Sequence, residues 1–359
     1  MTTTSAMSAM STMATMATMA TTIEYDYSDY TEGESCNRDD DNNLGAWLSI
    51  LYYFMFAFSL ISNGIVLIII HRFEQLTTVT NILLLNLVLS SLIFTSSLPF
   101  MAVYMQLSNW IFGEVMCKIV STVYYLGFYS SVLFLALLTL DRYLAVLYPL
   151  NDLQVRNRRC ATIFCTVVWL ISGLACIRPM IIYGTFSSSI DNKTFCDEHL
   201  LNLAYVNMNQ LRISGFYLQL ILFLIFPLLI IVFCYSRIVI TVLSSRIAAK
   251  FKTVRLIFII VLLFFACWTP FNIVLLHQIS NEITDCVEQR ELGYALQITR
   301  TIAYLYFCIS PVFYTFVGKK FQNHFKHLLV KHFPKLKKHV SVSHISRSNV
   351  STKNTANDF

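Results

Sequence analysis

The chain has 359 residues, of which 56% are hydrophobic and only 13% are charged, and its mean hydropathy is +0.61. About a quarter of the residues of a soluble domain are charged, so this composition excludes an ordinary soluble protein and indicates a membrane protein. The isoelectric point of about 8.7 does not indicate a partner made of nucleic acid, because the basic residues are confined to particular loops and to the C-terminal tail.

Residues 1–43 are expected to be a disordered acidic segment. Residues 1–22 are almost entirely Met, Thr, Ala and Ser, a low-complexity composition that is also typical of O-glycosylated stalks. Residues 1–43 hold eight acids against one base, a net charge of −7, and several tyrosines lie among the acids. This pattern indicates either a binding segment with sulfated tyrosines or simply a solvated acidic tail. The candidate ligand-binding residues are Tyr25, Asp26, Tyr27, Asp29 and Tyr30.

Seven apolar segments follow, each long enough to cross a hydrocarbon core about 30 Å thick. They span residues 46–70, 81–105, 115–140, 160–183, 214–242, 253–278 and 294–317. The predicted fold is an all-α membrane protein, with a seven-helix transmembrane bundle over residues 44–317. Residues 318–333 place Phe and Leu between Lys and His at helical spacing, which predicts an amphipathic helix in contact with membrane lipid. Residues 334–359 form the tail.

The distribution of basic residues predicts the orientation of these segments. The loops after the first, third and fifth segments carry Arg or Lys, and residues 319–353 add nine more, whereas the alternate loops are acidic or mixed. Cytosolic loops carry the excess of Lys and Arg. We therefore expect a multi-pass plasma-membrane protein with its N-terminus outside the cell and both the amphipathic helix and the tail in the cytosol.

This orientation places four cysteines outside the cell, where disulfides persist. They are Cys36, Cys117, Cys196 and Cys286. Four cysteines allow three pairings, and the sequence alone does not choose among them. No Cys/His cluster has zinc spacing, so we expect no metal site and no cofactor. Asn192 begins an Asn-Lys-Thr sequon in an outer loop and is a predicted glycosylation site.

The third apolar segment ends in the charged triplet Asp141-Arg142-Tyr143. Cys117 and Arg142 are separated by about 37 Å of helix at 1.5 Å per residue, so each lies just outside one membrane face. A charged pair at this depth is either an interfacial anchor, since arginine extends readily to the membrane surface, or a functional element.

With this triplet closing the third of seven segments, the chain resembles rhodopsin-like (class A) G protein-coupled receptors over residues 44–335. The other matching motifs are Asn63, Trp169, Pro227 with Tyr235, Cys267-Trp268-Thr269-Pro270 and Ser310-Pro311-Val312-Phe313-Tyr314. The resemblance implies that activation and G protein coupling depend on Asp141, Arg142, Tyr143, Tyr235, Trp268, Pro270, Pro311 and Tyr314.

Further motifs are similar to those of chemokine receptors. They are Ser97-Leu98-Pro99, Trp110-Ile111-Phe112-Gly113, the acidic tyrosine-rich N-terminus and the cysteines at 36 and 286. This resemblance implies two disulfides, Cys117–Cys196 and Cys36–Cys286. Within that group, residues 253–258 and 292–300, including Arg300, look most like the lymphotactin (XC-type) receptor.

The resemblance implies a receptor that couples a chemokine outside the cell to an inhibitory-class heterotrimeric G protein and arrestin inside it. The alternative is an atypical receptor that binds and internalises chemokine without G protein signalling. An enzyme or transporter is not expected, because no acid lies within the spanning segments away from their ends. The residues expected to line the ligand pocket are Trp110, Tyr124, Tyr125, Gln278, Arg300 and Tyr304. For Arg300, the alternative to ligand contact is a structural pair with Glu291 or a neighbouring loop acid.

Two positions depart from the resembled family. Ser91 stands where that family has aspartate, and Ser310 stands where it has asparagine. In the family, that aspartate and asparagine hold a buried sodium ion together with a serine, and Ser131 resembles this serine. Hydroxyls supply no negative charge to such an ion. We expect either a receptor that sodium does not modulate and whose basal activity is altered, or a repacked neutral network with ordinary signalling.

Overall fold

The computed structural model describes residues 42–73, 78–148, 157–187, 192–198, 208–244, 251–280, 285–317, 322–325 and 330. The chain divides into two units, residues 1–38 and 39–359, and all described residues belong to the second unit. The tyrosines and acids of residues 24–30, Cys36 and the tail lie outside the described residues, as do the side chains of Cys286, Pro311 and Tyr314.

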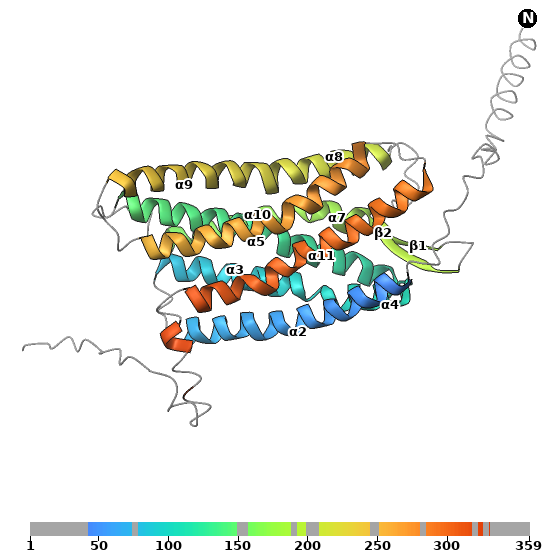
Figure 1. The fold of residues 1–359 in the computed structure, drawn as a ribbon, viewed down its shortest axis with the longest axis horizontal. Helices are drawn as coiled ribbons and strands as arrows, with labels where there is room; N and C mark the ends of the chain where they lie inside the picture. Colours follow the sequence, from blue (N-terminus) through green and yellow to red (C-terminus); the bar gives the residue numbers. More distant parts are fainter. Residues whose placement is uncertain are drawn as a thin grey trace, which may run out of the picture. The chain divides into compact units, whose positions relative to one another are not determined.

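Seven long helical stretches make up the described part of the second unit (Figure 1). They are α2 (Asn42–Phe73), α3 (Val79–Thr95) with α4 (Leu98–Leu107), α5 (Gly113–Leu147), α6 (Arg158–Ala175) with α7 (Ile177–Ile182), α8 (Met208–Leu220) with the π-helical turn η3 (Ile221–Ile225) and α9 (Phe226–Ser244), α10 (Phe251–Ser280), and α11 (Cys286–Val317). Six of them cover a predicted segment in full, and α6 with α7 ends one residue short of the predicted 160–183, because Tyr183 begins a strand. The prediction of an all-α membrane bundle is therefore confirmed.

Six of the described stretches are long and apolar enough to cross a membrane. The exception, α11, carries Glu288, Arg290, Glu291 and Arg300 in its first half. It nevertheless packs lengthwise against α10 and α2. Of the predicted amphipathic helix 318–333, residues 322–325 are helical and most of the remainder lies outside the described residues.

The second stretch is divided into α3 and α4 at Ser96 and Ser97. The Ser97 hydroxyl donates a hydrogen bond to the Phe94 carbonyl at 2.7 Å, and Pro99 lies in the first turn of α4. Proline has no N–H to donate and cannot continue the helical hydrogen-bond ladder. The serines therefore satisfy carbonyls of α3, and a new helix begins.

The helix α5 packs against α3, α6, α9 and the first strand. Its approach to α3 is close at Gly127, where an added Cβ would lie 2.5 Å from the Phe94 backbone nitrogen. Polar side chains also connect the helices. The Trp169 indole donates to the Asn86 side-chain oxygen at 2.9 Å, and the Asn63 amide donates to the Phe307 carbonyl at 3.4 Å. The core is therefore built around α5, with a few hydrogen bonds between neighbouring helices.

Besides the helices, the described chain contains a β-hairpin. Strands β1 (Tyr183–Ser187) and β2 (Thr194–Glu198) pair antiparallel, with Thr185 opposite Cys196. Two short hydrogen bonds attach the hairpin to the segment between α4 and α5. Trp110 N donates to Thr194 O, and Thr194 N donates to the Asn109 side chain, each at 2.7 Å. The hairpin is therefore held against the end of α5 at which α4 finishes and α11 begins (Figure 1).

Candidate functional site

The Cys117–Cys196 disulfide closes one end of the bundle, and we call this the disulfide end. It joins the first turns of α5 to β2 with a Cα–Cα distance of 5.7 Å, and Cys117 is fully buried. The pairing implied by the resemblance is confirmed for these two cysteines. The second implied pair, Cys36–Cys286, involves a residue and a side chain outside the described part of the chain.

Trp110 is buried at the disulfide end. Its side chain is 2% exposed and clusters with Cys117 and Val120, and its indole N–H donates to the Gly113 carbonyl at 2.8 Å. Its ring meets Phe112 edge-on with the centroids 5.1 Å apart. In this arrangement Trp110 supports the base of the hairpin, and it lies in a different cluster from the other predicted pocket residues.

Two of those other residues, Tyr124 and Tyr304, belong to a group of four rings that we call the aromatic cradle. Its members are Tyr52, Phe94, Tyr124 and Tyr304, from α2, α3, α5 and α11. The Tyr304 ring centroid lies 5.6 Å from Tyr52, 5.6 Å from Tyr124 and 5.1 Å from Phe94. Tyr125 adjoins the cradle, with its ring 4.9 Å from that of Tyr124. Four helices far apart in sequence thus meet at one aromatic site.

Arg300 lies one helical turn before Tyr304 and is half-buried beside the cradle. Its guanidinium carbon is 5.7 Å from the Phe271 ring centroid, and it interacts electrostatically with the hydroxyls of Tyr304, Tyr52 and Tyr124. Among the described side chains it has neither an ion pair nor a hydrogen bond. The predicted alternative, a pair with Glu291 or a neighbouring loop acid, is absent from the contacts of the described residues.

Gln278 is the remaining predicted pocket residue, near the end of α10. Its side-chain oxygen is buried and has no hydrogen-bond partner among the described residues. A buried amide oxygen without a partner is costly, so a ligand donor or a water would stabilise it.

The hairpin is connected to the bundle through polar side chains. The Tyr125 and Tyr183 hydroxyls lie 3.2 Å apart. Arg178 of α7 contacts Glu198 of β2 at 3.3 Å and donates to the Leu211 carbonyl of α8 at 3.2 Å. Burial raises the pKa of Glu198, and the positive charge of Arg178 opposes that rise. Arg178 therefore joins α7, α8 and the hairpin.

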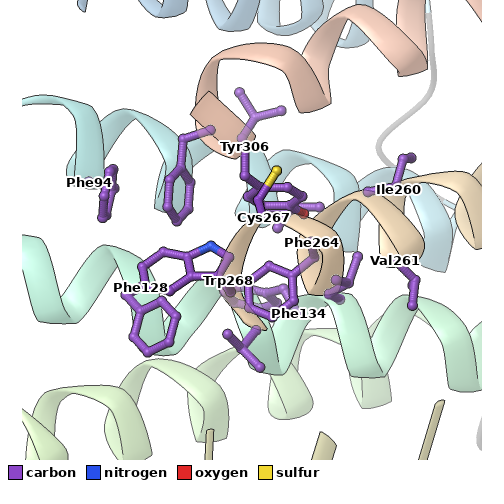
Figure 2. Close-up of a cluster of buried hydrophobic side chains, with 14 of the residues drawn as sticks. Phe94, Phe128, Phe134, Ile260, Val261, Phe264, Cys267, Trp268 and Tyr306 are labelled. Atoms are coloured by element: carbon purple, nitrogen blue, oxygen red, sulfur yellow. The ribbon is translucent and has the colours of Figure 1, made fainter. Parts of the chain in front are cut away.

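The cradle is continuous with the hydrophobic core around Trp268. The Phe94 ring lies 6.4 Å from Trp268, which is fully buried. Figure 2 shows Trp268 beside Phe128, their rings 4.1 Å apart, with Phe264 on the preceding turn of α10. A ligand that displaced the Phe94 ring would therefore press on Trp268, because close-packed interiors transmit strain.

The opposite end of the bundle holds the charged triplet, and we call it the Asp141 end. The Arg142 guanidinium contacts the Asp141 carboxylate at 2.6 Å. The Thr80 hydroxyl of α3 donates to the same carboxylate oxygen at 2.7 Å. The Tyr235 hydroxyl is buried beside Thr139, and the Tyr143 ring lies 6.0 Å from Phe233. The charged pair is thus held inside the bundle rather than anchored at its surface.

The three serines at the resembled sodium position are buried but do not form a cation site. The Ser91 hydroxyl donates to the Leu87 carbonyl of its own helix at 3.0 Å. The Ser131 hydroxyl has no described partner, and Ser310 is 1% exposed. Asp141 is the only buried acid in the described helices, and it is engaged at the Asp141 end. Three neutral hydroxyls lack the carboxylate that a dehydrated hard cation requires, so these residues do not fit a sodium ion.

The predicted glycosylation residue, Asn192, is exposed and has a backbone φ of 51° just before β2. Its exposure is compatible with modification, which stays a prediction.

Sequence reasoning missed several residues of these sites. Tyr52 and Phe94 belong to the aromatic cradle, Tyr183 contacts Tyr125, Phe271 packs against Arg300, and Thr80 contributes to the Asp141 end. Thr80 gives no local signal, since it is 61 positions from the carboxylate that it contacts. Tyr52 and Tyr183 are polar-tipped aromatics near segment ends, which is a weak signal, since such residues are also common at membrane interfaces.

Comparison with known proteins gives a consistent result. The profile of the family described as "7 transmembrane receptor (rhodopsin family)" matches residues 62–314. The C-C chemokine receptor type 3 of Cavia porcellus is 34% identical over 311 residues, which cover 84% of each chain. The human C-C chemokine receptor type 8 is 36% identical over 291 residues, covering 79% of each. The G-protein coupled receptor E1 of Equine herpesvirus 2 is 36% identical over 309 residues, covering 85% of this chain and 79% of that one.

Proposed function

Because the chain belongs to the rhodopsin family of seven-transmembrane receptors, and within it to the chemokine receptors of the C-C type, we propose that it binds a chemokine at the disulfide end and signals from the Asp141 end. The disulfide end then faces the outside of the cell, and the Asp141 end faces the cytosol. The inside partners are an inhibitory-class heterotrimeric G protein and arrestin.

The acidic segment captures the ligand in this proposal. Chemokines are small and basic, and residues 1–43 carry a net charge of −7, which sulfation of Tyr25, Tyr27 or Tyr30 would increase. Opposite charges attract over a Debye length of about 8 Å at physiological salt, and such steering raises the association rate and the specificity more than the affinity. The chemokine N-terminus then enters the aromatic cradle.

The observation that carries the signalling proposal is the intact Asp141–Arg142 pair with its third partner, Thr80. This arrangement can hold a closed state, and an agonist that binds the open state better than the closed one shifts the population toward it. Arg142 then leaves Asp141 to admit the G protein. Trp268 senses the packing of the cradle and Pro270 allows α10 to bend, while Tyr235 and Tyr314 stabilise the open form.

The test is inhibition of cyclic AMP formation in cells that express the full chain, with a panel of C-C chemokines and lymphotactin. Lymphotactin belongs in the panel because Arg300 and residues 253–258 and 292–300 resemble its receptor. Arg142→Ala is the control variant. A response to one chemokine that this variant abolishes supports signalling and names the ligand, and the absence of chemokine binding contradicts the proposal.

The alternative is a receptor that binds and internalises chemokine without G protein signalling. The neutral Ser91 and Ser310 favour it, because they alter the centre of the bundle, whereas the paired Asp141 and Arg142 argue against it. Binding and uptake that are identical in the parent and in Arg142→Ala, with no change in cyclic AMP, would support this alternative.

A further inference from the structure

We propose that the aromatic cradle selects a carboxylate-bearing group of its ligand, with Arg300 as the cation that recognises it. The inference rests on the proposed function, since it concerns the pocket that the N-terminal segment of the chemokine would enter, and the selected anion would be an acidic side chain of that segment and not its α-amino group. It states the chemistry of the entering group, which is an anion carried by an aromatic or aliphatic body.

The first observation is that Arg300 has no counter-ion among the described residues. The ion pairs of the described residues lie elsewhere, and one of them joins Asp141 to Arg142 at 2.6 Å. Glu114 pairs with Lys118 at 3.6 Å, and Glu198 pairs with Arg178 at 3.3 Å. A half-buried guanidinium without an anion gives up hydration that the protein does not replace, so an entering carboxylate would recover that free energy.

Helix geometry keeps the acids of α11 away from Arg300. Glu291 precedes it by nine residues, and at about 100° per residue nine residues place the two side chains on opposite sides of a helix. Glu288 and Glu291 are both exposed on the outer turns of α11. Tyr304 lies one turn beyond Arg300 on the same face. The sequence of α11 therefore directs the cation into the cradle and directs these acids elsewhere.

The groups around Arg300 suit an anion better than a cation. The Thr301 hydroxyl donates to the Gln297 carbonyl at 2.8 Å, and the Tyr52 hydroxyl lies 3.4 Å from the Thr301 oxygen, so Tyr52 is a neutral donor in the cradle. The hydroxyls of Tyr124 and Tyr304 are hydrogen-bonded to each other near the guanidinium, which leaves one of their two protons for a ligand. A carboxylate here would receive a charge-assisted hydrogen bond from arginine, and such bonds are about twice as strong as neutral ones. A ligand ammonium would be repelled by the guanidinium.

Arg300 could instead have one of two roles that involve no ligand carboxylate. It could serve only to pack over the Phe271 ring, as cation–π pairs do without any ligand. Alternatively, the anion could come from the eight acids of residues 1–43 of the same chain. Both roles make measurable predictions that differ from those of the proposal.

The experiment uses the full-length chain in neutral phospholipid nanodiscs and two probes that share one body, 2-naphthoate and 2-naphthylmethylammonium. Thermal-shift titration gives an apparent Kd for each probe. We expect naphthoate to bind at least about tenfold more tightly than the amine, as for a hydrogen bond to a charged group. Arg300→Gln removes the preference, Arg300→Glu reverses it, and Arg300→Lys keeps its sign. Arg290→Gln, an exposed arginine on the same helix, leaves it unchanged.

Equal affinity for the two probes in the parent, or a preference that survives Arg300→Gln, overturns the inference. The remaining role of Arg300 is then to pack over the Phe271 ring. Naphthoate binding that appears only after the acids of residues 24–41 are changed to amides also overturns it, in favour of the chain's own acidic segment. Because each preference is a ratio within one variant, a loss of stability does not imitate the result.

The chemokine panel measures a separate property, which is the binding of and response to a chemokine. If the protein responds to a chemokine but shows no preference between the two probes, only this inference is contradicted. A chain that prefers naphthoate but binds no chemokine contradicts the proposed function alone.

Discussion

Replacing Gly127 by alanine tests how closely α3 and α5 are packed. The added Cβ would lie 2.5 Å from the Phe94 backbone nitrogen, 2.6 Å from its Cβ and 2.7 Å from its Cα. Real Cβ atoms do not approach other heavy atoms this closely, and two of the three contacts are with backbone, so no side-chain rotation relieves them. Either α3 or α5 must move.

Overpacking a well-packed core costs about 1–3 kcal/mol, and a clash with backbone places Gly127→Ala near the upper value. At about 2 °C or more per kcal/mol, the melting temperature should fall by about 6 °C. Phe94 also belongs to the aromatic cradle, so movement of α3 would weaken chemokine binding as well as stability. The assay is thermal denaturation of the purified chain in nanodiscs.

Gly64→Ala is the matched control. This glycine also lies within a helix, but an added Cβ there meets no atom within 4 Å. Alanine is favoured over glycine in a helix by about 0.5–1 kcal/mol, so this variant should melt at the same or a slightly higher temperature. If Gly127→Ala melts within about 1 °C of Gly64→Ala, the close approach of α3 and α5 is wrong.

Three further predictions follow from the two ends of the bundle. Thr80→Val removes a hydrogen bond to the Asp141 carboxylate worth about 1.5–3 kcal/mol, which weakens the closed state. Basal inhibition of cyclic AMP should therefore rise by about tenfold or more. The control is Thr162→Val, which removes an exposed hydroxyl bonded within its own helix and should leave basal inhibition unchanged. Agonist affinity should be the same in sodium chloride and in the chloride of a large impermeant cation, and a clear loss of affinity in sodium would contradict the neutral serine site. Reduction or loss of the Cys117–Cys196 disulfide, which closes a 79-residue separation, should destabilise the chain by at most about 4.5 kcal/mol and abolish chemokine binding, as read by thermal denaturation and by binding to cells.

The sodium prediction has its own matched variant. Ser91→Asp with Ser310→Asn supplies the missing carboxylate and amide at the centre of the bundle. Sodium should then lower agonist affinity in this variant and not in the parent. An identical response of the two chains to sodium would show that the serines are not the reason for the insensitivity.

Much of the fold could be predicted from the sequence because hydropathy is a local property. The seven apolar segments, their order and the placement of Asp141-Arg142-Tyr143 at the end of the third follow from the length of helix that a bilayer requires. The break between α3 and α4 was not predicted, because segment length alone does not reveal where serine hydroxyls satisfy the carbonyls before Pro99. The hairpin was missed for a similar reason, since two short strands in a loop leave no hydropathy signal.

The sequence by itself determined the membrane-spanning segments and the kinds of residue at each end of the bundle. Only the tertiary structure decided which of them meet: Cys117 with Cys196, Thr80 with Asp141, and Tyr52 with Tyr304. These partners lie far apart in the chain, and no periodicity links residues on different helices. The environment of Arg300 depends on both. The helical period turns Glu291 away from it, and packing places the Phe271 ring of α10 and the side chains of Tyr52, Tyr124 and Tyr304 near it instead of acids.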